Sequence, residues 1–154
     1  MDEKSANITA IFEKAKRGEL DGIFVFRHDL SKAFGLEAWN AVRAKLKTVI
    51  YEGSNDNLTA ATADIVLPSA VYAEKEGTFT NFEGRVQRIR KAVEPLGQSH
   101  PTWRILTQLM QKWGIEAEFQ NAEAVFNELA AKTEAFRDLN YKKIGKLGLK
   151  WNKK

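Results

Sequence analysis

Three short apolar runs alternate with stretches of helical periodicity, and this order constrains the fold more than any other feature of the chain. Each run is too short and too rich in β-branched and aromatic residues for a helix, so each predicts a buried strand. The predicted strands are Gly22–Phe26, Thr48–Tyr51 and Ile65–Leu67. The predicted helices are at residues 6–17, 36–46 and 58–63. This alternation indicates an α/β fold, a three-layer Rossmann-like unit with a short parallel sheet.

The connections between these strands predict where a ligand would bind. Right-handed crossovers place the loops after Phe26, Tyr51 and Leu67 along the same carboxyl edge of the sheet. Pro68 ends the third strand, because proline lacks the backbone N–H that a continuing strand needs. Open α/β sheets bind their ligands at the carboxyl edge, so this edge is the expected location of any site.

The segment after Pro68 is predicted to leave the core and form a short hairpin on the surface. Residues 74–77 form a charged patch broken by a glycine, and the run at residues 85–90 has only Val86 and Ile89 as apolar residues. Two helices are predicted to follow, because apolar residues recur at helical spacing over residues 101–113 and 122–132.

The end of the chain has a different character. Seven large apolar or aromatic residues lie among lysines from Phe136 to Trp151 without a long regular period. A short helix and an extended segment are expected there. We therefore predict an α/β domain over residues 1–135 and a basic, aromatic C-terminal tail over residues 136–154.

Composition excludes several kinds of site. The chain has no cysteine, so it can form no disulfide, thiolate metal site or cysteine-held iron–sulfur cluster. Its two histidines, His28 and His100, are too few for a histidine metal cage and have no serine or cysteine nucleophile pattern nearby. No apolar run approaches the roughly 20 residues that span a bilayer, and no signal peptide opens the chain. We expect a cytoplasmic protein without direct membrane insertion.

The acidic candidates for catalysis are Glu74, Glu76 and Glu83. Paired carboxylates can perform acid–base chemistry when their environments separate their pKa values. However, Lys75 lies between two of them, so a solvated loop with local ion pairs is the favoured interpretation. No phosphate-binding glycine motif occurs either. We therefore expect no catalytic residue and no metal ligand.

The net charge is +4, and the basic excess lies mainly at residues 85–91 and in the tail. The arginine side chains there suit either phosphate and pterin recognition or pairing with an acidic partner surface, and we favour the second. No nucleic-acid-binding motif accompanies the charge, so a nucleic-acid partner is not expected.

Several segments together form a long and specific pattern: ADIVLP at 63–68, AEKEGTFTN at 73–81, EGRVQ at 83–87 and KAVEP at 91–95. This pattern resembles the molybdopterin oxidoreductase family. It is most similar to the C-terminal region of the large iron–sulfur subunit of NADH-quinone oxidoreductase (complex I), and the formate dehydrogenase alpha subunit is a further relative. The resemblance extends weakly to the flanking segments and so covers most of the chain.

The resemblance also shows departures from the family pattern. Family members that hold a molybdopterin guanine dinucleotide usually have a glycine after the first of these strands and an aspartate after the second. The aligned residues here are Arg27 and Gly53, which implies that this chain alone binds no cofactor. If the pterin is bound, the implied contacts are Thr59, Thr80, Asn81, Arg85 and Gln87.

The main functional expectation is a non-catalytic, split or truncated piece of the large iron–sulfur subunit in the peripheral arm of complex I. It would associate with other subunits of an NADH dehydrogenase or molybdopterin oxidoreductase complex, and through that complex with the inner membrane. An apolar surface patch is expected, because the sheet or helices of a partial fold lack the neighbouring elements that would bury them. The expected docking residues are Arg85, Arg88, Arg90, Tyr141, Leu149 and Trp151.

Two alternatives remain open. In the first, the chain supplies half of the site for a molybdopterin guanine dinucleotide shared with a partner chain, in a split formate-dehydrogenase-like molybdoenzyme. In the second, it is a nucleotide or nucleic-acid binding module, which salt-dependent DNA binding would support.

Overall fold

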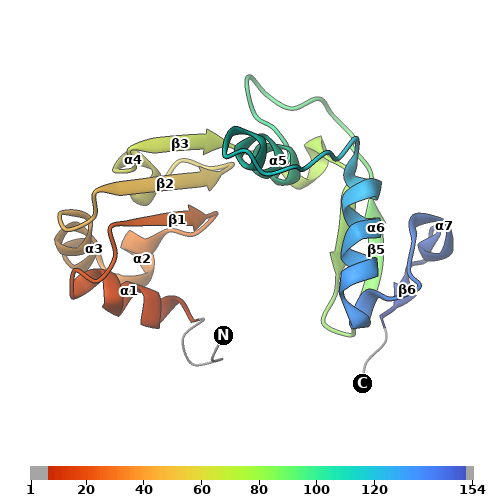
Figure 1. The fold of residues 1–154 in the computed structure, drawn as a ribbon, viewed down its shortest axis with the longest axis horizontal. Coiled ribbons are helices and arrows are strands. Elements are labelled where there is room, and N and C mark those ends of the chain that lie inside the picture. The colour runs from red at the N-terminus through yellow and green to blue at the C-terminus, as the bar shows by residue number, and fades with distance from the viewer. Residues whose placement is uncertain (1–6, 152–154) are drawn as a thin grey trace. The chain divides into compact units, whose positions relative to one another are not determined.

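The computed structural model describes residues 7–151. The chain forms two compact units, Met1–Pro68 (unit 1) and Ser69–Lys154 (unit 2), and each is described by itself. Unit 1 contains the parallel sheet and unit 2 the hairpin with the C-terminal helices (Figure 1). The expected mixed α/β fold is confirmed.

Unit 1 is built on a three-stranded parallel sheet in the order β1-β2-β3. The strands are β1 (Gly22–Phe26), β2 (Thr48–Gly53) and β3 (Ile65–Pro68). All three lie where the sequence predicts them. The second strand continues two residues beyond the predicted end, through Glu52 and Gly53, and this extension brings an acidic residue into the sheet.

Within residues 7–68, four helices accompany the sheet: α1 (Ile8–Lys16), α2 (Leu30–Phe34), α3 (Leu36–Arg43) and α4 (Leu58–Ala61). Asn7, Asp29 and Asn57 cap α1, α2 and α4 by accepting a hydrogen bond from a backbone N–H in the first turn. The predicted helix at residues 36–46 corresponds to α3, whereas α2 lies in the preceding segment, where a connection was predicted. Gly35 separates them, because its φ of 90° and ψ of 146° interrupt the helical backbone.

The helices pack against one face of the sheet. Val25, Val49 and Tyr51 from the strands share a core with Trp39 and Val42 of α3, and Trp39 is fully buried. Side chains alternate along a strand, so Phe24, Phe26, Ile50, Ile65 and Leu67 belong to the opposite face. Phe26 and Ile65 on that face are 44% and 47% exposed, and the expected apolar patch stays a prediction.

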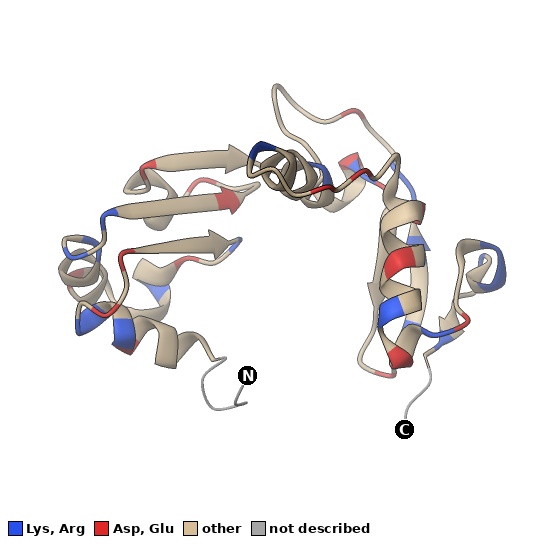
Figure 2. Ribbon diagram, in the orientation of Figure 1, with Lys and Arg blue, Asp and Glu red and all other residues tan. Residues whose placement is uncertain are grey.

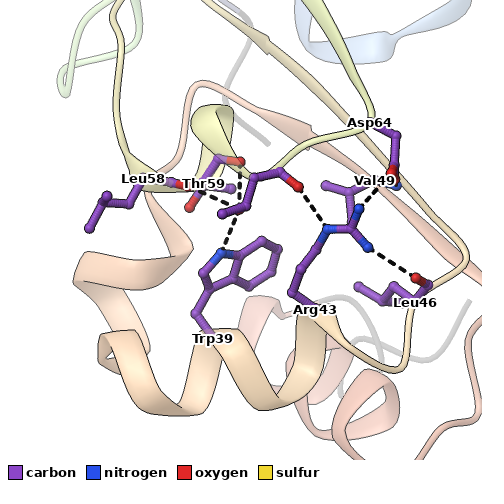
Figure 3. A network of polar contacts seen from close by, with 8 residues as sticks. Trp39, Arg43, Leu46, Val49, Leu58, Thr59 and Asp64 are labelled. Atoms are coloured by element: carbon purple, nitrogen blue, oxygen red, sulfur yellow. Dashed lines mark hydrogen bonds and ion pairs between the residues drawn. The ribbon is translucent and has the colours of Figure 1, made fainter.

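A polar network at the amino end of the sheet joins α3 to β2 and β3 (Figure 3). The Arg43 guanidinium donates to the carbonyl oxygens of Thr62 (2.7 Å) and Leu46 (3.1 Å) and to the Asp64 carboxylate. Asp64 also accepts from the Val49 backbone N–H at 2.6 Å. The network therefore satisfies backbone groups of the connections that precede β2 and β3.

Unit 2 begins with η2 (Tyr72–Glu74) and the hairpin of β4 (Gly77–Thr80) and β5 (Arg85–Ile89). A third antiparallel strand, β6 (Leu149–Lys150), pairs with β5. The helices are α5 (Thr102–Lys112), α6 (Ala122–Lys132), η3 (Glu134–Phe136) and α7 (Tyr141–Ile144). The predicted hairpin and both long helices are present.

The tail segment contributes to the core of unit 2. Leu139, Tyr141 and Ile144 pack with Val86 of β5 and Phe126 of α6, and all five are buried. The segment from residue 136 onward thus shares a core with the hairpin and α6, while its status as a separate domain stays a prediction. No helix within residues 7–151 is long and apolar enough to cross a membrane.

Candidate functional site

The carboxyl edge of the parallel sheet carries an ion pair between the ends of two neighbouring strands. Arg27 follows β1 directly, and its Nε lies 3.5 Å from Oε2 of Glu52 in β2. The Arg27 backbone N–H also donates to the Glu52 carbonyl oxygen at 2.7 Å. Figure 2 shows the basic and acidic positions at the ends of these strands. The guanidinium side chain is 39% exposed, whereas the carboxylate is fully buried.

The backbone conformation of Arg27 is unusual for a residue with a side chain. Its φ is +52°, in the left-handed region where a residue with a Cβ is disfavoured and glycine is preferred. Only one other non-glycine residue within residues 7–151, Asp138, has a positive φ. A residue with this backbone conformation beside a buried carboxylate at the carboxyl edge of the sheet is a candidate functional feature.

Sequence reasoning missed Glu52. The family comparison looked for an acidic residue at Gly53, and the structure shows one a single position earlier, at the end of β2. Gly53 has a packing role instead, because a Cβ there would lie 2.5 Å from the ring of Tyr51. The available signal was an acidic residue directly after an apolar run, which the predicted strand Thr48–Tyr51 left out.

A hollow of about 350 Å³ lies at the same edge. The loop at residues 53–56 forms one wall, and Tyr51, Val66 and Pro68 contribute the sheet side. Asn57 donates through Nδ2 to the Tyr51 hydroxyl at 2.6 Å and so steadies this wall. Strand alternation puts Tyr51 and Glu52 on opposite sides of β2. A polar side chain therefore lies on each side of the sheet at the end of this strand.

The structure gives Thr59 an internal role. Its fully buried hydroxyl accepts from the backbone N–H groups of Leu30 (2.8 Å) and Ser31 (3.3 Å) and donates to Asp29 Oδ1 (3.1 Å). The Ser31 hydroxyl donates to the same Asp29 oxygen, and this bond is the main cause that lowers the pKa of the Asp29 carboxyl. Thr59 therefore ties α4 to the start of α2.

The other predicted pterin contacts belong to unit 2. Asn81 Oδ1 accepts from the backbone N–H groups of Glu83 (3.0 Å) and Arg85 (2.9 Å), so it shapes the hairpin turn. Arg85 donates to the Gly148 carbonyl oxygen at 3.4 Å. Thr80 and Gln87 are exposed on β4 and β5. Within unit 1, Thr59 alone represents the predicted set, and its contact with a cofactor stays a prediction.

The predicted docking residues divide by exposure. Arg90 and Leu149 are exposed, whereas Tyr141 is only 3% exposed and packs on Phe126. The Arg88 guanidinium lies 4.1 Å from the centre of the Tyr141 ring, and Trp151 contacts the Phe136 ring. Burial is the main cause that raises the pKa of the Tyr141 hydroxyl. The aromatic members of this set thus pack within unit 2.

The acidic and histidine candidates show no catalytic arrangement. Glu74 is buried and accepts from the backbone N–H groups of Val71 (2.9 Å) and Leu96 (3.3 Å), a structural role. Glu76, Glu83 and His28 are exposed. Among residues 7–151, no group of three or more His, Cys, Asp or Glu side chains is placed to hold a metal ion.

Comparison with known proteins assigns the family. A sequence model of the family described as molybdopterin oxidoreductase matches residues 2–112, most of the chain. The chain belongs to the molybdopterin oxidoreductase family. A solved structure, acetylene hydratase from Pelobacter acetylenicus, matches 90% of the chain with a TM-score of 0.69 and 18% identity, which supports the fold. The match covers 20% of that structure.

The sequence relatives include two alpha subunits of formate dehydrogenases, from Methanococcus maripaludis and Methanocaldococcus jannaschii. Each is 44% identical over 95 residues, or 60% of this chain, and the chain spans 14% of the length of each relative. The expected family is confirmed. These relatives favour the formate dehydrogenase alternative over the main expectation of a piece of a complex I subunit, which they do not support.

Proposed function

We propose that this chain forms part of a formate-dehydrogenase-like molybdoenzyme and holds the nucleotide end of a molybdopterin guanine dinucleotide at the carboxyl edge of its parallel sheet. The Arg27–Glu52 pair at that edge carries the proposal. Open α/β sheets bind nucleotides there, and a buried carboxylate at a strand end is suited to accept hydrogen bonds from ribose or base.

The residues of unit 1 fit the nucleotide part of this cofactor. Glu52 offers a buried acceptor for hydroxyl or N–H donors, and Arg27 offers a guanidinium for phosphate oxygens. The loop at residues 53–56 borders a hollow within the usual size range for small-molecule sites. Unit 1 would thus bind and orient one end of the cofactor.

The described residues offer no set of ligands for the molybdenum end of the cofactor. The chain has no cysteine, and its described part has no cluster of metal-binding side chains. When bound, the molybdenum supplies two-electron redox chemistry, and its protein environment would come from a partner chain or from further polypeptide. We expect no activity from this chain alone.

Purification of the protein from its source cells under native conditions tests the proposal. Co-purifying chains are identified by mass spectrometry, and molybdenum is measured in the same fractions. We expect molybdenum together with a chain that carries the catalytic portion of a formate dehydrogenase. Recovery with flavin- and iron–sulfur-bearing NADH dehydrogenase subunits, and without molybdenum, would instead establish the structural role in complex I. Recovery as a monomer without molybdenum would contradict both.

The structural role in complex I remains the second candidate because of one observation. Thr59, the residue that matches the polar position of the family, uses its hydroxyl in three contacts within unit 1 and is fully buried. A cofactor-binding position that has become part of the packing is expected when only the fold is retained. The metal analysis distinguishes the two candidates.

A further inference from the structure

The two faces of the antiparallel sheet in unit 2 differ in character. Val86 of β5 points to one face and shares a core with residues of α6 and α7. Side chains alternate along a strand, so Arg85 and Gln87 lie on the opposite face. The register adds Phe79 of β4, opposite Gln87, and Lys150 of β6, opposite Arg85. We call Phe79, Arg85, Gln87 and Lys150 the hairpin face.

The hairpin face carries two basic side chains at directly opposite positions. Like charges at such positions destabilise a sheet, and Arg85 and Lys150 are cross-strand partners. Arg85 donates to the Gly148 carbonyl oxygen, but no salt bridge within residues 7–151 joins either side chain to a carboxylate. Arg90, which follows β5, is exposed and adds to the positive charge. An acidic surface would offset this charge.

The turn of the hairpin presents an aromatic side chain in a defined position. Phe82 is 95% exposed. The side-chain oxygen of Asn81 accepts from the backbone N–H groups of Glu83 (3.0 Å) and Arg85 (2.9 Å). The Asn81 carbonyl oxygen also accepts from the Gly84 N–H at 2.9 Å. These bonds fix the backbone on both sides of Phe82.

The C-terminal segment supports the same turn. The backbone N–H of Trp151 donates to the Gly84 carbonyl oxygen at 2.9 Å, and the indole lies so close to Gly84 that a Cβ there would overlap it. Because the turn is already ordered, little conformational entropy is lost when the Phe82 ring enters an apolar pocket. Aromatic residues are enriched in protein interfaces, and Phe79 on the hairpin face is a second exposed ring, at 54%.

We propose that the hairpin face and Phe82 dock an acidic segment of the chain that carries the molybdenum end of the enzyme. Carboxylates of that chain would pair with Arg85 and Lys150, and Phe82 would enter an apolar pocket beside them. A nucleic acid fits less well, because it carries phosphates along its whole length and would meet Glu83 in the turn. The inference rests on the proposed function, since it names the surface by which the two chains associate.

Charge reversal at Lys150 separates docking from folding. Lys150→Glu replaces a like-charge pair across β5 and β6 with an opposite-charge pair, so the melting temperature should stay the same or rise. Docking should weaken, because the new carboxylate faces the carboxylates of the partner. Phe82→Ser tests the anchor, since a ring that is 95% exposed contributes little to the core of unit 2. A folding defect would instead lower the melting temperature and docking together.

The experiment uses the full chain, with the molybdenum-bearing chain that co-purifies with it as the probe. Dissociation constants are measured by biolayer interferometry at constant ionic strength for the parent, Phe82→Ser and Lys150→Glu. Tyr72→Ser and Lys112→Glu are the matched controls, because they change an exposed aromatic residue and an exposed lysine of unit 2 outside the hairpin face. The parent complex is also treated with a carbodiimide, which joins amines directly to contacting carboxylates, and the linked peptides are identified by mass spectrometry.

We expect Phe82→Ser and Lys150→Glu each to weaken binding about tenfold or more, while both controls bind like the parent. A cross-link should join Lys150 to an aspartate or glutamate of the partner. If either hairpin variant binds the molybdenum-bearing chain like the parent, or if Lys150 forms no such cross-link, the docking surface is wrong and the proposed function stands.

Two further outcomes would also overturn the proposal. If the parent binds a fluorescent single-stranded oligonucleotide and both hairpin variants lose that binding without losing the partner, the hairpin face is a nucleic-acid surface. If no molybdenum-bearing chain co-purifies with the parent, the proposed function fails, and the docking surface fails with it.

Discussion

At the scale of single residues, the ionised carboxylate of Asp64 contributes to the stability of the folded state. Its carboxylate accepts from the Val49 backbone N–H at 2.6 Å and pairs with Arg43. The hydrogen bond from Val49 is the main cause that lowers the pKa of Asp64. A carboxyl whose pKa is lower in the folded state stabilises the protein above its unfolded pKa of about 4, and this contribution is lost as the pH falls through the folded pKa.

We therefore expect Asp64→Asn to lower the free energy of unfolding at pH 7 and to lose this effect in acid. Urea denaturation of both proteins at pH 7 and at pH 3 measures the difference. The gap between variant and parent should narrow at the lower pH, because the parent carboxyl is then becoming protonated. A gap that is equal at both pH values would show that the carboxylate charge has no part in the stability of unit 1.

Thr59 gives the second prediction at this scale. Replacing it by valine keeps its shape but removes the acceptor of the Leu30 and Ser31 N–H groups. Unsatisfied buried donors are costly, so we expect a loss of about 1–3 kcal/mol in the free energy of unfolding. Thr59→Ser retains the hydroxyl and serves as the control in chemical denaturation. A valine variant as stable as the serine variant would contradict the role that we assign to Thr59.

At the scale of elements, Gly35 determines that α2 and α3 are separate helices. Its φ of 90° with ψ of 146° belongs to a region that is essentially reserved for glycine, although a Cβ there would have no neighbour within 4 Å. The cost of Gly35→Ala is thus confined to the backbone and is expected to be about 1–3 kcal/mol. Thermal denaturation measures it, with Lys32→Ala, an exposed helical position, as the control. An unchanged melting temperature in Gly35→Ala would show that the turn adapts.

The comparison of elements also shows what the sequence can predict. The strands of the parallel sheet were predictable because each is a short β-prone run, and the hairpin because its turn residues separate two short segments. The helix α2 was missed, since its five residues are too few to show a helical period. The pairing of β6 with β5 joins residues more than 60 positions apart, for which local periodicity holds no information. Glu52 was missed for a related reason, because an acidic residue after an apolar run resembles the start of a loop.

At the scale of the whole molecule, the exposed apolar side chains on the second face of the parallel sheet in unit 1 lead to a prediction about association. Parallel sheets are normally covered on both faces, and the helices of unit 1 pack on the face of Val25 and Val49. On the other face, the Phe24 and Phe26 rings stack with their centres 4.3 Å apart, and Ile65 is 47% exposed. Apolar surface of this kind favours association with other apolar surfaces.

We expect the purified chain without partners to bind a hydrophobic dye such as anilinonaphthalene sulfonate and to self-associate as its concentration rises. The double variant Phe26→Gln, Ile65→Gln should reduce both the dye fluorescence and the sedimentation coefficient at high concentration, because it makes this face polar. Leu147→Gln is the control: Leu147 is 84% exposed in unit 2 and does not belong to the sheet face. If Leu147→Gln reduces association as strongly as the double variant, the association does not arise from the sheet. If the parent chain neither binds the dye nor associates, this face of the sheet does not present enough apolar surface to drive association. The idea that the chain needs a partner to bury the face would then be wrong.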